Sequence, residues 1–314
     1  MRDNRDDDGE NERSKIIRGG GGELFNRLPE GCVAAAISFT GPRDACRLAS
    51  VSTLFKSAAY YDAVWDCFLP SDYRDFIARS DGGGEGLESL SKRDLFLRLA
   101  HRPLLIDAST KSFFLDKSTG KKCFTISARE LVIIWGDTPR YWSFHSFPES
   151  RFPEVAELHL VCWLEIKGKL KASMLSPDTT YTAYLVFKMT ETAYGFYSPA
   201  QVTITTPGGQ IETQKVYLKY EDGEAGNPRH QMVPRRMILF NRIRTPLFEA
   251  PPHPKMLPRE RLDRWLEVEI GELFIGLGED GEVEMSVMEV AGNWKSGLIV
   301  EGLEIRPKVL GCEN

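Results

Sequence analysis

Long apolar runs are missing from this sequence, which limits where the protein can act. A membrane helix needs about eighteen consecutive apolar residues, and no apolar run among the 314 residues comes close to that length. The segment from Met1 to Asp8 is mostly charged, and no apolar stretch of the kind found in a signal peptide follows it. We therefore expect neither secretion nor membrane insertion, and we place the protein in the cytoplasm, the nucleus or both.

Cysteine pairs and glycosylation acceptors are also missing. The six cysteines are scattered, none forms a Cys-x-x-Cys pair, and no Asn-x-Ser/Thr sequence occurs. This pattern predicts reduced thiols in an intracellular compartment. The cysteines are Cys32, Cys46, Cys67, Cys123, Cys162 and Cys312.

Signatures of catalysis are absent as well. The chain has no Gly-x-Gly-x-x-Gly, no phosphate-binding Gly-Lys-Ser/Thr, no Gly-x-Ser-x-Gly and no His-Glu-x-x-His, and its five histidines are dispersed. Paired carboxylates of the kind a glycosidase needs occur in residues 279–284. A solvated turn has the same pattern, and we favour that interpretation. We therefore expect no catalytic residues, no metal and no cofactor.

Excess positive charge is absent too. The chain has 45 acidic and 40 basic side chains, a net charge of -5 and a pI near 5.7. Such a balance disfavours general binding to a nucleic-acid backbone. With 42% hydrophobic residues, the chain is long enough for two domains that each bury a core.

The first third of the chain is predicted to be helical after a disordered tail. Residues 1–22 are dense in charge and end in four glycines, so they bury too little apolar surface to offset the entropy of ordering. Apolar residues then recur at helical spacing through residues 23–70. Residues 71–109 contain the same texture from Ser91 to His101 and are expected to form a helical linker region.

The dominant period changes to two in residues 110–308. Apolar and polar side chains alternate in residues 156–166, 266–270 and 283–287, which predicts half-buried strands. Turn-rich segments separate such strands at residues 116–120, 206–209 and 278–281. No amphipathic helices alternate with the strands, which favours an antiparallel sandwich. The expected fold class is a small all-α domain followed by an all-β sandwich and a short tail at residues 309–314.

An ordered set of residues in segment 23–70 resembles an F-box. The set is Leu28-Pro29, Ile37, Phe39, Pro42-Arg43-Asp44, Cys46-Arg47, Leu48, Val51-Ser52, Phe55 and Trp65. A segment this short cannot bury all of these apolar side chains by itself, so the remainder needs a partner. The resemblance implies that the partner is the Skp-type adaptor of a cullin-based ubiquitin ligase. The implied adaptor-binding residues are Leu28, Pro29, Val33, Ile37, Leu48, Val51, Phe55 and Trp65.

A second resemblance covers nearly all of residues 110–308. Its sequence elements are Ala128-Arg129-Glu130-Leu131, Ile133-Ile134-Trp135, Asp137 to Trp142, Val161 to Lys169, Gly278 to Met285, Trp294-Lys295-Ser296-Gly297 and Ile305-Arg306-Pro307. They resemble the phloem protein 2 family, whose relatives include the tobacco leaf lectin. The resemblance implies a jelly-roll β-sandwich that binds N-acetylglucosamine oligomers and N-glycan cores. An F-box followed by this domain is a known plant arrangement.

The same resemblance implies that Trp135 and Trp142 contact sugar. An aromatic ring can lie against the apolar C–H face of a pyranose while nearby polar groups bind its hydroxyls. We expect the polar groups to be Asp137, Tyr141, Glu279 and Glu282.

The six tryptophans do not all fit a binding role. Trp135 ends an apolar run and fits a core position equally well, whereas Trp142 is expected on a loop. Trp163, Trp265 and Trp294 are expected to be packing residues. Phe144 stands where the tobacco lectin has tryptophan, which implies an altered or lost sugar preference.

Taken together, these resemblances imply a non-catalytic F-box subunit of an SCF-type ubiquitin ligase. Its F-box would bind the adaptor, and through it a cullin, while the sandwich captures a target that carries an N-glycan or N-acetylglucosamine. One alternative is a protein-protein interaction module on a lectin fold that has lost sugar binding. Another is a cytosolic lectin with a degenerate F-box.

Overall fold

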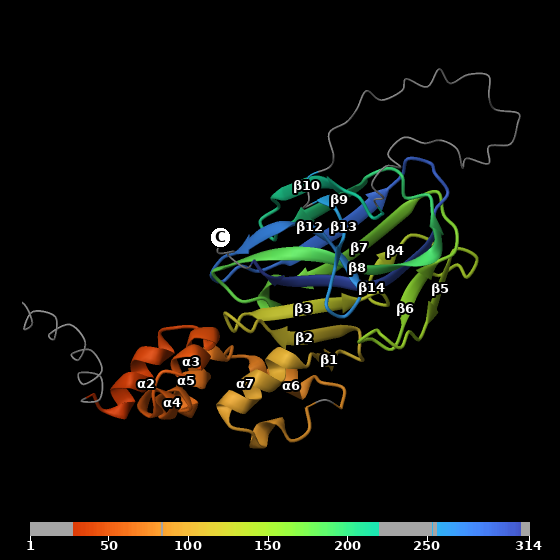
Figure 1. The fold of residues 1–314 in the computed structure, drawn as a ribbon. Helices are drawn as coiled ribbons and strands as arrows, with labels where there is room; N and C mark the ends of the chain where they lie inside the picture. The colour runs from red at the N-terminus through yellow and green to blue at the C-terminus, as the bar shows by residue number, and fades with distance from the viewer. Residues whose placement is uncertain (1–27, 83, 220–252, 254–255, 309–314) are drawn as a thin grey trace, which may run out of the picture. The chain divides into compact units, whose positions relative to one another are not determined.

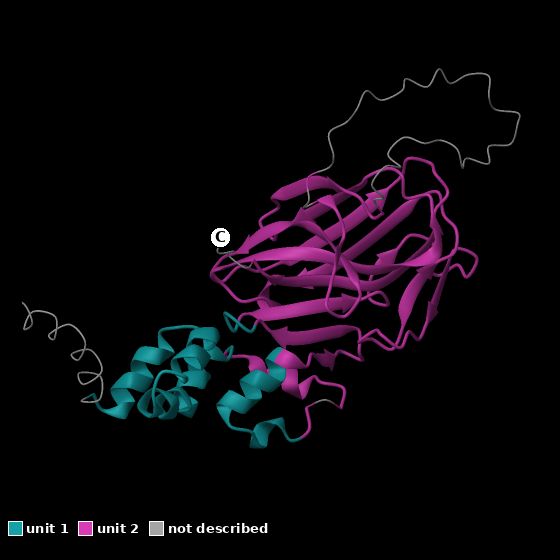
Figure 2. Cartoon of the chain, in the orientation of Figure 1, with its two compact units in different colours: residues 1–70, 86–100, 117–120 teal, residues 71–85, 101–116, 121–314 magenta. Residues whose placement is uncertain are grey.

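The computed structural model describes residues 28–82, 84–219, 253 and 256–308. The tails expected at residues 1–22 and 309–314 lie outside this described part. The chain divides into two compact units (Figure 2). Unit 1 holds residues 1–70, 86–100 and 117–120, and unit 2 holds residues 71–85, 101–116 and 121–314. Among the described helices, none has the length and apolar character needed to span a membrane.

The first described part of the chain is helical, as the sequence predicts. Its elements are α2 (Glu30–Ser38), α3 (Pro42–Leu48), α4 (Thr53–Ala59), α5 (Asp62–Phe68), α6 (Tyr73–Ala78), the 3-10 helix η1 (Leu87–Ser89) and α7 (Lys92–His101). Pro42 occupies the first position of α3, where its missing N–H costs no hydrogen bond. The Ser52 hydroxyl accepts a hydrogen bond from the Phe55 N–H at 3.3 Å and caps α4.

Unit 1 packs around a buried tryptophan. The Trp65 Nε1–H donates to the Ala59 carbonyl at 2.7 Å, so its polar group is satisfied inside the core. The Trp65 ring packs against Phe68 and Phe96, with ring centroids 5.6 and 5.3 Å apart. These contacts join α5 and α7 within one core.

Unit 2 contains two antiparallel sheets (Figure 1). The nine-stranded sheet has the order β1-β2-β3-β14-β8-β12-β11, and β6 joins it beside β14 with β5 next to β6. Its strands are β1 (Leu104–Ile106), β2 (Lys111–Leu115), β3 (Lys122–Ser127), β5 (Trp142–His145), β6 (Val155–Leu158), β8 (Thr179–Tyr194), β11 (Arg259–Glu260), β12 (Leu266–Ile275) and β14 (Ser296–Pro307). The five-stranded sheet has the order β10-β9-β13-β7-β4, with β4 (Val132–Ile133), β7 (Leu164–Lys171), β9 (Ala200–Thr205), β10 (Ile211–Val216) and β13 (Glu282–Glu289).

The two sheets pack closely face to face. A Cβ atom added at Gly168 on β7 would lie 2.7 Å from Leu303 on β14. A side chain at this position would have to displace the ends of the Leu303 and Leu131 side chains. Because Leu303 faces the other sheet, the neighbouring Glu304 faces outward.

One predicted strand was wrong. Residues 156–166 do not form a single strand, because β6 ends at Leu158 and β7 begins at Leu164 in the other sheet. Between them, Val161 forms an isolated bridge with Lys295. The alternation of apolar residues continues through this crossover, and it therefore hid the break. The first sheet strand also begins at Leu104, before the expected boundary at residue 110.

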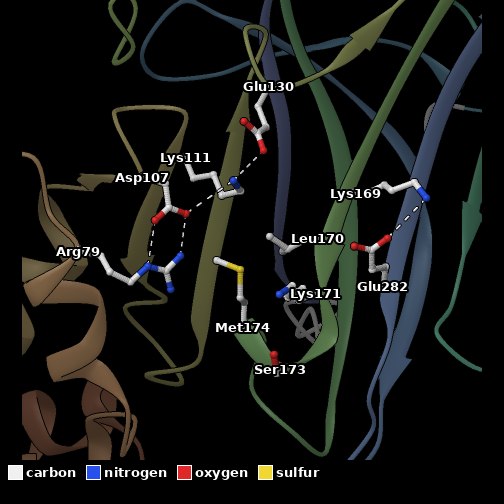
Figure 3. Close-up of a pocket in the computed structure, with 10 residues that line it drawn as sticks. All are labelled: Arg79, Asp107, Lys111, Glu130, Lys169, Leu170, Lys171, Ser173, Met174 and Glu282. Atoms are coloured by element: carbon white, nitrogen blue, oxygen red, sulfur yellow. Dashed lines mark hydrogen bonds and ion pairs between the residues drawn. The ribbon is translucent and has the colours of Figure 1, made fainter.

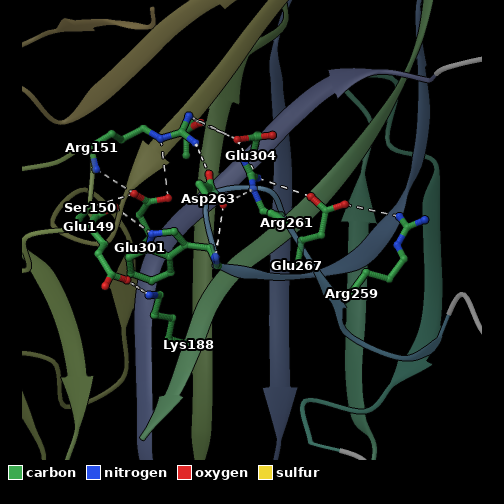
Figure 4. A network of polar contacts seen from close by, with 12 residues as sticks. Glu149, Ser150, Arg151, Lys188, Arg259, Arg261, Asp263, Glu267, Glu301 and Glu304 are labelled. Carbon is green, nitrogen blue, oxygen red and sulfur yellow. Dashed lines mark hydrogen bonds and ion pairs between the residues drawn. The ribbon is translucent and has the colours of Figure 1, made fainter.

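A buried ionic network covers the outward face of the nine-stranded sheet (Figure 4). The carboxylate of Glu304 lies 3.4 Å from Arg151, 3.1 Å from Arg261 and 3.0 Å from Arg306. Desolvation by burial acts to raise the pKa of Glu304, but the attraction of these three guanidinium groups outweighs it and lowers the pKa. The network holds the segment before β6 and the turn before β12 against the sheet.

Candidate functional site

The described part of unit 1 has a set of apolar side chains that stay exposed and are not buried in its core. Of the residues expected to bind an adaptor, Leu28, Pro29 and Val51 are exposed, while Leu48 and Phe55 are half-buried. Val33, Ile37 and Trp65 are buried in the core. The buried three therefore support the helices, and the exposed three are available for contact with a partner.

Phe39 is the most exposed large apolar side chain in the described part of unit 1 and was left out of the expected adaptor-binding residues. It follows α2 directly and is 91% exposed, while its backbone N–H donates to the Ala36 carbonyl at 3.3 Å. The signal was present in the sequence, because Phe39 stands between the polar residues Ser38 and Thr40 at the end of a short helix. A phenylalanine held in water by a fixed helix end is a candidate contact residue.

Several loops of unit 2 gather at one end of the sandwich, which we call the loop end. The register places the last residues of β4, β6, β8 and β13 beside the first residues of β5, β7, β9 and β14. The loop end therefore comprises residues 134–141, 159–163, 195–199 and 290–295. Among the described residues of unit 2, it contains the exposed aromatic side chains Trp135, Trp163, Tyr197 and Trp294, and the exposed Tyr194 stands directly before it at the end of β8.

Trp135 is exposed on a strained turn. It has a φ of 59°, a left-handed conformation that a bulky residue rarely adopts, and its side chain is 41% exposed. The turn is closed by hydrogen bonds from Gly136 N–H to the Ile133 carbonyl at 2.9 Å and from Thr138 N–H to the Trp135 carbonyl at 3.0 Å. Its ring lies 5.6 Å from that of Tyr141. Of the two sequence interpretations of Trp135, the core position is excluded.

The expectation that Trp142 lies on a loop is wrong. Trp142 is the first residue of β5, pairs with Leu158 on β6 and is only 2% exposed. The loop ends at Tyr141, which is half-buried, and Asp137 on that loop is exposed. The Trp142 Nε1–H is buried without a hydrogen-bond acceptor among the described residues. The Trp142 N–H donates to the Thr138 carbonyl at 3.1 Å, so Trp142 anchors the end of the Trp135–Tyr141 loop through its backbone and does not present its ring to solvent.

The packing role expected for two other tryptophans is also wrong. Trp163 is 45% exposed and Trp294 is 55% exposed, whereas Trp265 is buried as expected. Each of these two tryptophans follows apolar residues or stands in a segment that resembles the phloem protein 2 family. The sequence alone does not show that the chain turns there to cross between sheets or strands. The Trp163 Nε1–H donates to the Glu165 carboxylate at 2.8 Å. Hydrogen bonds from Lys167 and Trp163 lower the pKa of Glu165, so this carboxylate is an ionised acceptor at neutral pH.

The two expected glutamates lie far from the tryptophans. Glu282 pairs with Lys171 at the other end of β13, seven positions from Glu289 at the loop end, which is about 23 Å at the usual rise of a strand. It lines an open polar pocket of about 490 Å³ together with Arg79, Asp107, Lys111 and Lys169 (Figure 3). Glu279 accepts a hydrogen bond from Gly276 N–H at 2.7 Å and closes the turn before β13.

Most of the charged side chains that line the polar pocket are paired with one another. Arg79 donates two hydrogen bonds to Asp107, at 3.0 and 2.7 Å, and these bonds with the attraction of Arg79 and Lys111 outweigh desolvation and lower the pKa of Asp107. Lys111 also contacts Glu130 at 3.0 Å. Among the described residues, no group of three or more His, Cys, Asp or Glu side chains is arranged to hold a metal ion.

These observations define a class of protein: a helical unit with an exposed apolar set, followed by an antiparallel β-sandwich with an aromatic loop end. The phloem protein 2 family model matches residues 121–307. The chain is 41% identical over 308 residues to F-box protein PP2-B1 of Arabidopsis thaliana, covering 90% of each chain. It is 42% identical over 290 residues to putative F-box protein PP2-B12 of the same plant, covering 91% of this chain and 99% of the relative.

This chain therefore belongs to the plant F-box proteins of the phloem protein 2 family. Among solved structures, a likeness is found to TmCBM61 in complex with beta-1,4-galactotriose, with a TM-score of 0.28, 9% identity and coverage of 57% of this chain and 87% of that chain. A similarity this low supports no inference about ligands.

Proposed function

We propose that the chain is a non-catalytic substrate receptor of an SCF-type ubiquitin ligase. Its helical residues 28–70 would bind a Skp-type adaptor, and through it a cullin, by the exposed side chains Leu28, Pro29, Phe39 and Val51. The exposed apolar set carries this half of the proposal, because such side chains gain free energy when a partner removes them from water. The buried Val33, Ile37 and Trp65 would hold the helices in place for that contact.

The sandwich would bind a target through its glycan, with N-acetylglucosamine oligomers and N-glycan cores as the expected ligand class. The Trp135–Tyr141 pair carries this half of the proposal. It offers an aromatic surface fixed by a strained turn, and backbone strain of this kind is concentrated at functional sites. Asp137 on the same loop supplies an exposed carboxylate for sugar hydroxyls. Trp142 would position this loop, and Glu279 and Glu282 would lie outside the site.

Together the two units would raise the local concentration of the target near a ubiquitin-charged enzyme. This is an effective-concentration effect that needs both contacts at once. It requires no bond-making by this chain, in accordance with the non-catalytic role proposed.

The adaptor half is tested by co-purification with a plant Skp-type adaptor. The full-length wild type is expected to form a stable complex, and Phe39→Ser combined with Val51→Ser is expected to lose it. Leu262→Ser in unit 2 changes a fully exposed apolar residue and serves as the matched control. A complex that forms equally well with the double variant would contradict the proposed contact residues.

The glycan half is tested by titrating the full chain with N-acetylglucosamine oligomers and N-glycan cores. Trp135→Ala is expected to weaken binding about tenfold, the loss of about 1.4 kcal/mol of ring contact. Phe274→Ala, an exposed aromatic on β12, is the control and should bind as the wild type. Absence of binding to every glycan by the folded wild type would replace this half with direct recognition of a protein surface.

A further inference from the structure

We propose that Trp163 and Trp294 form a second aromatic platform at the loop end, so that the site takes an extended oligosaccharide chain and not a single sugar. This inference rests on the glycan-binding function proposed above. It assigns a binding role to two residues that the sequence marks only as packing residues.

The distribution of the tryptophans is the first observation. Of the six tryptophans, Trp65, Trp142 and Trp265 are buried. The three exposed ones, Trp135, Trp163 and Trp294, all lie at the loop end. An exposed indole ring leaves a large apolar area in water. Three exposed indole rings at one end of a sandwich therefore mark a ligand-binding surface.

The second observation is a buried ion pair that contacts both of the loops that carry Trp163 and Trp294. Lys295 is completely buried and forms an ion pair with the buried Glu289. Its ammonium also donates to the Cys162 carbonyl at 3.0 Å and to the Asn293 carbonyl at 2.8 Å. The residues that carry these carbonyls stand directly before Trp163 and Trp294. A single lysine thus fixes the backbone directly before both tryptophans.

A bridge between the two loops reinforces this arrangement. The backbone of Val161 pairs with that of Lys295 through hydrogen bonds of 3.0 and 2.7 Å. Desolvating a charge pair costs several kcal/mol per ion, so burying a lysine is far less favourable than burying an apolar side chain of the same size. The structure assigns Lys295 as the positioning residue of the platform.

The platform lies next to the Trp135 turn. The Ile134 N–H donates to the Glu165 carbonyl at 3.0 Å, which places the turn on the strand neighbouring the start of β7. Neighbouring strands are about 4.8 Å apart. Glu165 also accepts the Trp163 Nε1–H and so ties that side chain to the same position. Consecutive rings of one oligosaccharide can therefore reach both aromatic surfaces.

Polar groups accompany the platform, as a sugar site needs. The Asn293 amide donates to the Ser198 hydroxyl at 3.4 Å across the loop end. Glu165 provides an ionised carboxylate beside Trp163. Aromatic surface with a few fixed polar groups is the composition that binds a pyranose, whose rings have apolar faces and polar edges.

The experiment compares chain length with aromatic surface in the full-length protein. Wild type, Trp135→Ala, Trp163→Ala, Trp294→Ala and the control Phe274→Ala are titrated with N-acetylglucosamine oligomers of increasing length by calorimetry. We expect wild-type affinity to rise with length. Trp135→Ala should weaken every oligomer, whereas Trp163→Ala and Trp294→Ala should remove the gain with length, about tenfold, and spare the shortest ligand that binds.

Lys295→Met adds a test of positioning. This change keeps an unbranched side chain but removes the hydrogen bonds to both carbonyls, and Glu289→Gln in the same chain removes the charge left behind. The double variant should retain its fold, measured by circular dichroism, and should lose the gain with length as the tryptophan variants do. Rescue of that gain by Lys295→Arg alone would support a positioning role.

The outcomes separate the two proposals. If wild type binds the oligomers but Trp163→Ala and Trp294→Ala bind every length as the wild type does, the second platform is wrong and the glycan function stands. If wild type binds no glycan at all, both are wrong. If these two variants lose the shortest ligand as strongly as Trp135→Ala does, one small site exists and the extended one is contradicted.

Discussion

At the scale of single residues, the outward face of the nine-stranded sheet depends on carboxylates that face arginines. Glu301 and Glu304 are both almost completely buried, yet their pKa values shift in opposite directions. Desolvation dominates at Glu301 and raises its pKa against the attraction of Arg151. At Glu304 the attraction of three guanidinium groups dominates. The number of paired arginines therefore decides whether each charge stabilises the fold.

Glu301→Gln should show this difference in its pH dependence. Because the folded pKa of Glu301 lies above its ordinary value of 4.5, the folded protein binds more protons there than the unfolded chain, and the stability from Glu301 falls as the pH rises. The variant can still accept the hydrogen bonds of Ser150 and of the Arg151 N–H. We therefore subtract the free energy of unfolding of the wild type from that of the variant, both measured in urea. This difference should be higher at pH 7.5 than at pH 4.5.

Glu304→Gln is the matched comparison and should behave in the opposite way. The lowered pKa of Glu304 means that its contribution to stability is present at neutral pH and is lost as the pH falls through the folded pKa. Its variant should be less stable than wild type at pH 7.5, with a smaller difference at low pH. Two variants with the same pH trend would contradict the assignment.

Single residues also show what the sequence could predict. Alternation identified Trp265 as a packing residue, and the structure confirms that it is buried. The same packing role was expected for Trp163 and Trp294, which are exposed, whereas Trp142 was expected on a loop and is buried. Whether an aromatic residue next to a strand end faces the core or the solvent depends on where the chain turns, and alternation continues across those turns.

At the scale of elements, the loop end is assembled from segments that must approach closely. Gly195 follows β8 with a φ of 90°, and a Cβ atom there would overlap the carbonyl oxygen of Trp294. Glycine thus permits both the left-handed conformation and the contact between the two loops. The loop that carries Trp294 depends on this one position.

Gly195→Ala should therefore destabilise the protein by more than about 1 kcal/mol and displace the Trp294 loop. Gly209→Ala is the matched control, because Gly209 has a similar φ of 79° but open space around its missing Cβ. We expect the Gly195 variant to unfold at clearly lower urea concentration than the Gly209 variant. Equal unfolding midpoints would show that the contact with Trp294 contributes nothing.

Elements were predicted well where a single periodicity coincided with a single strand or helix. The expected strands at residues 266–270 and 283–287 lie within β12 and β13, and the expected turns at residues 206–209 and 278–281 connect β9 to β10 and β12 to β13. The segment 156–166 failed because both of its halves are strands, in different sheets, with the same alternation. Pairing in three dimensions, which periodicity does not encode, decides such cases.

At the scale of the whole molecule, the proposed function requires two contacts on two separate compact units. The exposed apolar set lies in unit 1 and the aromatic loop end lies in unit 2. Because changes at residues that share no contact partners act independently, each contact should be removable without the other.

Phe39→Ser with Val51→Ser should abolish adaptor binding and leave glycan affinity within about twofold of wild type. Trp135→Ala should weaken glycan binding and leave the adaptor complex intact. The two measurements are co-purification with the adaptor and calorimetric titration with the oligomer. Loss of both activities in either variant, with the fold intact, would contradict separable contacts.

A bridging measurement tests directly whether one chain holds the adaptor and the glycan at the same time. An N-acetylglucosamine oligomer is immobilised, and retention of a plant Skp-type adaptor is measured with and without the full-length chain. We expect the adaptor to be retained only when the chain is present, and Trp135→Ala or the Phe39→Ser and Val51→Ser double variant to reduce its retention. If the wild-type chain does not retain the adaptor, although each partner is shown to be folded, the chain is not a receptor that links glycan to adaptor.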